Sequence, residues 1–184
     1  MEQLNPRSRS DEYGSRINRD HSRILVYAVP WASVLLGSFI PSILIATALP
    51  LIPPLGFIML LAWRMLRPGL LPVWAGFPLG IFDDLFSGQP FGSAILLWSL
   101  AMIALEVIET RFPWRDFWLD WVTASGLLIV YIAAGALLSG ASITLPMLVA
   151  LGPQLLLSIL TYPLLTRIAS RLDRFRLMRI RTIA

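Results

Sequence analysis

The chain has 184 residues, of which 57% are hydrophobic and only 14% are charged, and its formal net charge is +4. A soluble domain of this size carries more charge, and the apolar runs here exceed the roughly 20 residues that a helix needs to cross a bilayer. There is no cysteine, and the single histidine, His21, lies in a polar stretch, so we expect no disulfide, thiolate chemistry, metal site or other cofactor.

Two helical spans are predicted after a polar tail. Residues 1–23 are rich in charge, contain five arginines and are typical of a flexible N-terminal tail. The first span is predicted over about 24–45 and the second between about 47 and 63. Three prolines crowd the stretch 50–54, so about ten clean helical residues follow them. This segment could therefore enter the bilayer as a bent or re-entrant element, which only covering protein would tolerate.

The third span is predicted over about 70–86. It carries Gly76 and Gly80, four residues apart on one helical face. Two glycines at this spacing let another helix approach closely, and the motif alone leaves open whether that helix belongs to the same chain or to a second copy. A stretch dense in turn formers, 87–92, follows this span.

Three further spans are predicted over about 93–108, 121–138 and 145–165, which gives an all-α membrane domain over 24–166. A C-terminal tail, 167–184, follows with six arginines that alternate with apolar residues. As a helix this tail would be basic and amphipathic, which is typical of a segment lying on anionic lipid. Contact with a cytosolic partner is the alternative interpretation.

The arginines predict the orientation of the chain in the membrane. All fifteen basic residues are arginines, and they lie in the two tails, the turn 64–69 and the connection 109–120. The three connections on the opposite side hold none. We therefore predict an even number of spans, with both termini in the cytoplasm, and interpret the basic charge as a topology signal rather than a nucleic-acid contact. Four or five spans are the alternatives if the proline-rich segment does not cross.

Four aromatic residues precede the fifth span at the spacing i, i+3, i+4, i+7, which places their rings on one helical face. Tryptophan prefers the headgroup region of a bilayer, so we interpret the group as an interfacial anchor for the fifth span. A docking surface for a partner's helix is the alternative. The four residues are Trp114, Phe117, Trp118 and Trp121.

Two adjacent acids, Asp83 and Asp84, are predicted near the outer end of the third span. Carboxylates at membrane depth usually mark function. A protease dyad needs two facing carboxylates, whereas adjacent helical residues point about 100° apart, and Glu106 and Glu109 lie toward the opposite side. An aspartate beside a Gly-Pro-Gly turn is expected to accept backbone N–H bonds and to hold the helix–turn–helix geometry. Contact with a small ligand is the alternative.

The stretch from Gly80 to Gly92 reads G-I-F-D-D-L-F-S-G-Q-P-F-G. It resembles the G-x-x-x-D-x-x-x-G-x-P-x-G signature of the MreD family of rod-shape proteins, and the resemblance is specific over about residues 48–100. Asp83 is an additional acid beside the signature. The residues on its fixed positions are Gly80, Asp84, Gly88, Pro90 and Gly92.

The resemblance implies a compact six-helix fold similar to the substrate-binding subunits of energy-coupling-factor transporters. It implies an inner-membrane subunit of the elongation machinery that binds MreC and, through it, MreB, RodA and a class B penicillin-binding protein. No catalytic residue carries over, so we expect a non-enzymatic scaffold in lateral peptidoglycan synthesis and cell-shape control. A small-ligand-binding transport subunit is the alternative, and it predicts a cavity open to the outer side. An intramembrane enzyme would need a second acid or a nucleophile close to Asp84.

Overall fold

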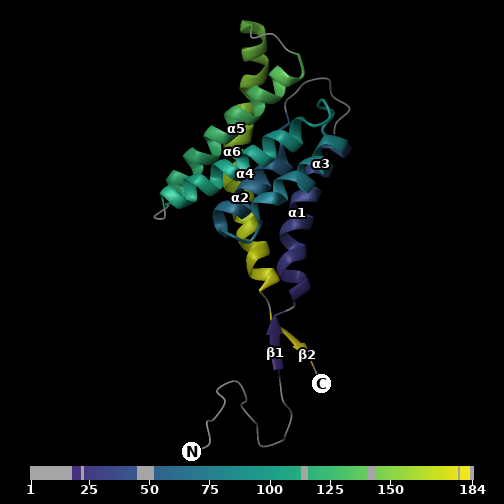
Figure 1. Ribbon diagram of the computed structural model, residues 1–184, viewed down its shortest axis with the longest axis vertical. Helices are drawn as coiled ribbons and strands as arrows, with labels where there is room; N and C mark the ends of the chain where they lie inside the picture. Colours follow the sequence, from purple (N-terminus) through teal and green to yellow (C-terminus); the bar gives the residue numbers. More distant parts are fainter. Residues whose placement is uncertain are drawn as a thin grey trace, which may run out of the picture.

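Six α-helices form one bundle in the part of the chain that the computed structural model describes (Figure 1). The described residues are 18–21, 23–44, 52–112, 116–140, 144–177 and 179–182. The helices are α1 (Arg23–Leu44), α2 (Leu55–Leu66), α3 (Gly76–Phe86), α4 (Ser93–Arg111), α5 (Phe117–Leu138) and α6 (Leu145–Arg176), with a short 3-10 helix, η1 (Val73–Ala75), before α3.

Two short strands lie outside the bundle. β1 (Asn18–His21) and β2 (Arg179–Thr182) pair in antiparallel fashion below the helices, on the side where both termini lie (Figure 1). The pair joins parts of the two predicted tails. The rest of the predicted N-terminal tail, apart from Arg23 at the start of α1, lies outside the described residues.

Four of the helices are long and apolar enough to cross a membrane: α1, α4, α5 and α6. The other two are short, with 12 residues in α2 and 11 in α3. At about 1.5 Å per residue these helices rise roughly 17–18 Å, which is less than the hydrocarbon thickness of about 30 Å. The all-α architecture is therefore confirmed for the bundle, while the six predicted spans correspond to four helices long enough to cross a membrane and two short ones.

Prolines explain why two predicted spans are short. Proline lacks an N–H and disfavours the helical conformation in the residue before it, so helices commonly begin at or just after a proline. α2 begins directly after Pro54 and ends before Pro68, as the proline spacing predicts. Pro72 precedes η1, so α3 begins at Gly76 rather than near residue 70. Residues 45–51, which include the start of the predicted second span, lie outside the described residues.

α2 is the central helix of the bundle. Its residues from Gly56 to Met65 are all buried, and α1, α5 and α6 pack around it. The ring of Phe57 also contacts Trp98 of α4, with 5.7 Å between the ring centroids. Because protein surrounds α2, its length does not have to match the lipid. The long helices instead expose large apolar side chains, as a lipid-facing surface does, among them Leu36, Ile43, Leu100, Val122 and Leu164.

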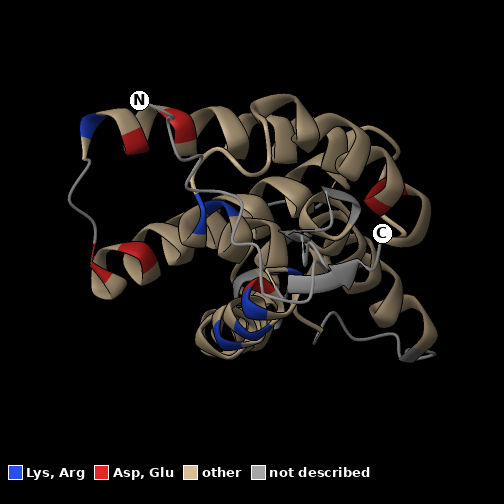
Figure 2. Ribbon diagram, turned by 90° about the horizontal axis from the view of Figure 1, so that it is seen from below, with Lys and Arg blue, Asp and Glu red and all other residues tan. Residues whose placement is uncertain are grey.

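The chain alternates between two ends of the bundle. One end, which we call the hairpin end, holds the α3–α4 turn together with the end of α1, the start of α2, the end of α5 and the start of α6. The opposite end, which we call the arginine end, holds the C-terminal ends of α2, α4 and α6 and the start of α1. Most of the helical ribbon carries no charged residue (Figure 2).

A buried arginine ties α2 to α4 at the arginine end. Arg64 is 2% exposed, forms ion pairs with Glu106 and Glu109, and donates a hydrogen bond of 3.1 Å to the carbonyl of Leu71. The Arg64–Glu109 pair measures 2.9 Å. The two glutamates therefore join α4 to α2 at this end, whereas Asp83 and Asp84 lie at the opposite end of the bundle.

α6 is longer than the predicted sixth span. It runs for 32 residues, roughly 48 Å at about 1.5 Å per residue, so residues 167–176 of the predicted tail continue the helix. Asp173 pairs with Arg67 at 2.9 Å and with Arg176 at 2.6 Å. Arg176 also donates to the carbonyl of Val26 and lies over the ring of Trp63. These contacts hold the extension of α6 on the bundle, which a boundary at residue 166 does not anticipate.

Candidate functional site

Asp84 caps α4 from the preceding helix. Its carboxylate accepts hydrogen bonds from the backbone N–H groups of Gly92 (2.9 Å), Ala94 (2.9 Å) and Ile95 (3.2 Å). The first amides of a helix lack partners within the helix, and the residue before α4, Gly92, has no side chain to supply one. The buried carboxylate of Asp84 takes this role and also meets the positive end of the α4 dipole. This is the backbone bonding expected of an aspartate before a Gly-Pro-Gly turn.

The turn between α3 and α4 depends on two glycines with left-handed backbone. Gly88 has φ +69° and Gly92 has φ +97°, and both belong to the signature. Residues with a Cβ adopt this region only at a cost, so the chain reverses here most readily with glycine. Pro90 accepts a hydrogen bond from the N–H of Ser93 at 3.0 Å. The turn thereby places the first backbone amides of α4 next to the carboxylate of Asp84.

Gly76 and Gly80 face α4 of the same chain. A Cβ on Gly80 would come within 2.7 Å of Cα of Ile95, and a Cβ on Gly76 within 2.9 Å of the carbonyl oxygen of Trp98. Such distances are shorter than real Cβ contacts, so only glycine allows the two backbones to pack this closely. The glycine pair is therefore occupied within the bundle, which favours internal packing over dimerisation through this face.

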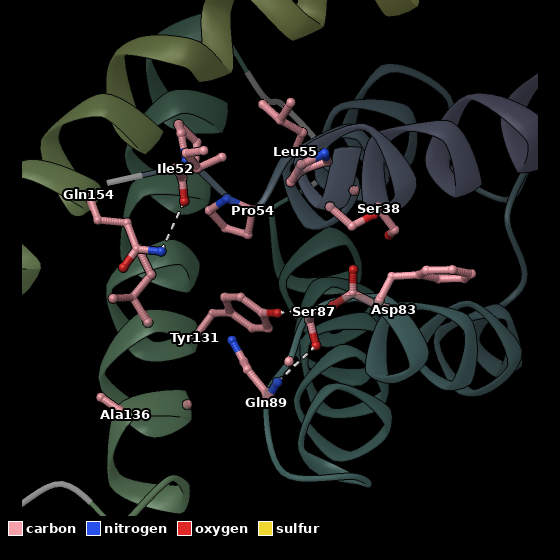
Figure 3. A pocket seen from close by; sticks show the side chains of 18 of the residues that line it. Ser38, Ile52, Pro54, Leu55, Asp83, Ser87, Gln89, Tyr131, Ala136 and Gln154 are labelled. Carbon is pink, nitrogen blue, oxygen red and sulfur yellow. Dashed lines mark hydrogen bonds between the residues drawn. The ribbon is translucent and has the colours of Figure 1, made fainter. Parts of the chain in front are cut away.

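Asp83 points to the other side of α3, into a cavity. The cavity has a volume of about 730 Å³ and lies at the hairpin end between α1, α2, α3, α5 and α6. Asp83 is 7% exposed, and Tyr131 of α5 donates a long hydrogen bond of 3.4 Å to its carboxylate. Figure 3 shows Ser38 of α1 near this carboxylate, and Gln89 of the turn on the side of Tyr131. Adjacent residues on one helix thus point in different directions, as helical geometry requires.

The remaining lining of the cavity mixes apolar and polar groups. Gln154 of α6 faces it and donates a hydrogen bond of 3.0 Å to the carbonyl of Ile52 (Figure 3). Sequence reasoning did not identify Ser38, Tyr131, Gln89 or Gln154 as site residues. The available signal was that three of them are polar groups inside otherwise apolar spans.

The aromatic residues before the fifth span divide into two groups. Phe117 and Trp118 lie in the first turn of α5 and are exposed. Trp121 instead packs against the core and donates a hydrogen bond of 3.2 Å to the carbonyl of Ile159 on α6. Trp114 lies outside the described residues. The exposed pair suits an interfacial anchor, whereas Trp121 joins α5 to α6.

One hydroxyl lies near Asp84. Ser93 Oγ is 3.4 Å from the carboxylate of Asp84 and 3.3 Å from the side-chain oxygen of Gln89. A serine nucleophile needs a base that is free to take its proton. Three backbone amides already engage the carboxylate of Asp84, so this arrangement stabilises the helix start and is poorly suited to proton transfer.

No family model, curated protein or solved structure matches the chain. Its functional interpretation therefore depends on the signature residues and on the geometry of the hairpin end.

Proposed function

We propose that the chain is a membrane scaffold subunit of the MreD type. In this proposal it lies in the bacterial inner membrane, binds MreC, and through MreC joins MreB, RodA and a class B penicillin-binding protein in lateral peptidoglycan synthesis and cell-shape control. The observation that carries the proposal is the α3–α4 hairpin. The five signature residues shape it, Asp84 holds it with three backbone amides, and the apolar side chains of Leu85 and Phe91 are exposed on it.

A rigid hairpin with exposed apolar residues supports partner binding. Leu85 is 64% exposed and Phe91 is 72% exposed, while the N–H of Gly92 in the turn donates to Asp84. An interface gains most from apolar anchors whose conformation is already set before binding. MreC, whose bulk is periplasmic, would meet this end of the bundle if the hairpin end faces the periplasm.

The arginine distribution supports that orientation. In the described helices the arginines lie at the arginine end, where α2, α4 and α6 finish. Arginine-rich ends of membrane helices stay in the cytoplasm. We infer that both termini are cytoplasmic and that α2 and α3, together with the segments beside them, complete six passes in a fold like that of the substrate-binding transporter subunits.

Four acids of the bundle form structural contacts, which supports a role without catalysis. Asp84 accepts backbone amides, Glu106 and Glu109 pair with Arg64, and Asp173 pairs with Arg67. Groups that are engaged in this way stabilise structure and offer no poised acid, base or nucleophile.

A pull-down of the tagged protein from its native membrane in mild detergent tests the proposal. We expect MreC to be recovered together with RodA and the penicillin-binding protein, and depletion of the protein to turn rod-shaped cells into rounded ones. Normal rods after complete depletion would contradict the scaffold role.

A small-ligand-binding transport subunit is the second candidate, and the cavity at the hairpin end favours it. The cavity lies within the range of about 300–1,000 Å³ that is usual for small-molecule sites, and Asp83, Gln89 and Tyr131 line it. Recovery of an ATPase and coupling subunits in the same pull-down, without wall-synthesis proteins, would favour transport over scaffolding.

A further inference from the structure

Asp83 is a buried carboxylate with too few partners. Its neighbour Asp84 accepts three backbone amides, whereas Asp83 has a long hydrogen bond from Tyr131, at 3.4 Å, and the hydroxyl of Ser38 nearby. A buried charge is costly unless a cation or several hydrogen-bond donors accompany it. A carboxylate in this position therefore calls for a further partner.

The described part of the chain brings no cation near Asp83. The sequence has no basic residue between Arg67 and Arg111, between Arg23 and Arg64, or from residue 116 to 166. Among the described residues that line the cavity, Asp83 is the one charged group. The two buried arginines of the described bundle, Arg64 and Arg176, pair with acids at the opposite end. A cation that pairs with Asp83 would therefore come from outside the described part of the chain.

A second polar group in the cavity lies beside Asp83. Ser38 of α1 is 6% exposed and lines the cavity, and its hydroxyl lies near the carboxylate of Asp83 without forming a close hydrogen bond among the described residues. A donor that enters the cavity could bond to both groups. Figure 3 shows Ser38 and Asp83 on the same side of the cavity, with Tyr131 opposite. The carboxylate of Asp83 and the hydroxyl oxygen of Ser38 can both accept hydrogen bonds from a single donor group of a ligand.

The rest of the cavity lining suits the apolar part of a ligand. Pro54, Leu55, Phe86, Ile132 and Leu151 surround the polar groups. A ligand that fits this lining carries its charge at one end and hydrocarbon or an aromatic ring at the other.

We propose that this cavity binds a small organic cation: a primary ammonium group on an apolar body, with Asp83 as its counter-ion. An ammonium supplies three donors, which matches the carboxylate of Asp83 and the hydroxyl of Ser38. An anion of the same size finds no positive group in the lining. The site goes beyond the scaffold role, and neither proposal depends on the other.

Calorimetric titration of the purified full-length protein with benzylammonium tests the site. Benzyl alcohol and benzoate serve as probes of nearly the same shape without the positive charge. We expect saturable binding of benzylammonium alone, and an affinity about tenfold or more lower in Asp83→Asn, which removes the charge with little change in shape.

Two control variants and a folding check accompany the titration. Asp116→Asn removes an exposed acid at the start of α5 and is expected to leave the affinity unchanged. Asp83→Glu keeps the carboxylate and is expected to retain the preference for the cation over the alcohol. Circular dichroism and gel filtration establish that Asp83→Asn is folded. Equal binding of benzylammonium and benzyl alcohol by the wild type, or equal affinity in Asp83→Asn, overturns the proposal.

The same titration identifies the source of the cation. Binding that persists when the protein is purified with its partners assigns the site to a free amine. Binding that is present in the isolated protein and lost in the complex assigns the site to a cationic side chain of a partner, and both results support a cation site.

Discussion

Asp83 and Asp84 are adjacent in the chain and buried to a similar degree, yet they meet different surroundings. The carboxylate of Asp84 completes the first turn of α4, and the carboxylate of Asp83 lines a cavity with one long hydrogen bond. The roughly 100° between neighbouring helical residues is enough to give two acids two roles. One role serves the fold, and the other is available to a ligand.

Asp84→Asn is expected to destabilise the protein more than Asp83→Asn. Asparagine keeps one acceptor oxygen but turns an NH₂ group toward amides that themselves donate, so at least one buried N–H loses its partner. The expected cost is about 1–3 kcal/mol of unfolding free energy. Thermal unfolding in detergent measures the stability, and the yield of the partner complex measures assembly.

Asp83→Asn is the matched control, because it makes the same chemical change one residue away. It removes a buried charge that has few partners, so we expect little loss of stability. Equal and mild effects of the two substitutions would mean that the carboxylates are merely solvated.

At the scale of elements, α3 and α4 form one unit. Gly76 and Gly80 bring the two helix backbones into contact, the glycines of the turn reverse the chain, and Asp84 closes the unit. The signature thus specifies a helical hairpin whose buried face is already occupied, and whose outer face is free to bind.

Gly80→Ala is expected to destabilise this hairpin. The added Cβ would lie 2.7 Å from Cα of Ile95 and 2.9 Å from the carbonyl oxygen of Ala94, and backbone atoms cannot move aside as a flexible side chain can. Overpacking of this kind costs about 1–3 kcal/mol. A fall in the unfolding temperature measures the effect.

Gly126→Ala on α5 serves as the control for helix propensity. A Cβ at Gly126 meets no atom within 4 Å, so the substitution should be neutral or slightly stabilising, by up to about 1 kcal/mol. If both alanine variants unfold at the wild-type temperature, the close α3–α4 packing does not contribute to stability.

At the scale of the whole molecule, the arginine end is closed by contacts between distant parts of the chain. Asp173 and Arg176 of α6 contact Arg67 after α2 and the carbonyl of Val26 in α1. The extension of α6 therefore belongs to the folded bundle.

Deletion of residues 167–184 is expected to leave the orientation unchanged and to lower the stability. Earlier arginines, among them Arg64 and Arg67, still mark the same end, whereas the contacts of Asp173 and Arg176 are lost. The chain has no cysteine, so single introduced cysteines report the side of each connection by labelling. The unfolding temperature should fall by a few degrees.

Deletion of residues 178–184 alone is the control, because it keeps α6 and its ion pairs. It is expected to unfold close to the wild-type temperature. A flipped or degraded product of the longer deletion would contradict the view that the earlier arginines are sufficient for the orientation.

The local features of this protein could be predicted from the sequence alone. Apolar runs placed the helices, prolines predicted where α2 begins, and glycines at 88 and 92 predicted the turn. The arginine pattern also predicted which connections share an end. These features follow from interactions between residues that are close in the chain, or from the transfer of side chains between water and lipid. Such patterns can be recognised in one segment at a time.

Only the tertiary structure decided which distant residues meet. It separated Asp83 from Asp84, paired Arg64 with the glutamates of α4, turned Gly80 toward α4, and extended α6 onto the bundle. It also opened a cavity beside Asp83. These outcomes depend on how the other helices pack against α2 and against one another, and the rotation of each helix about its axis is set by its neighbours rather than by its own sequence.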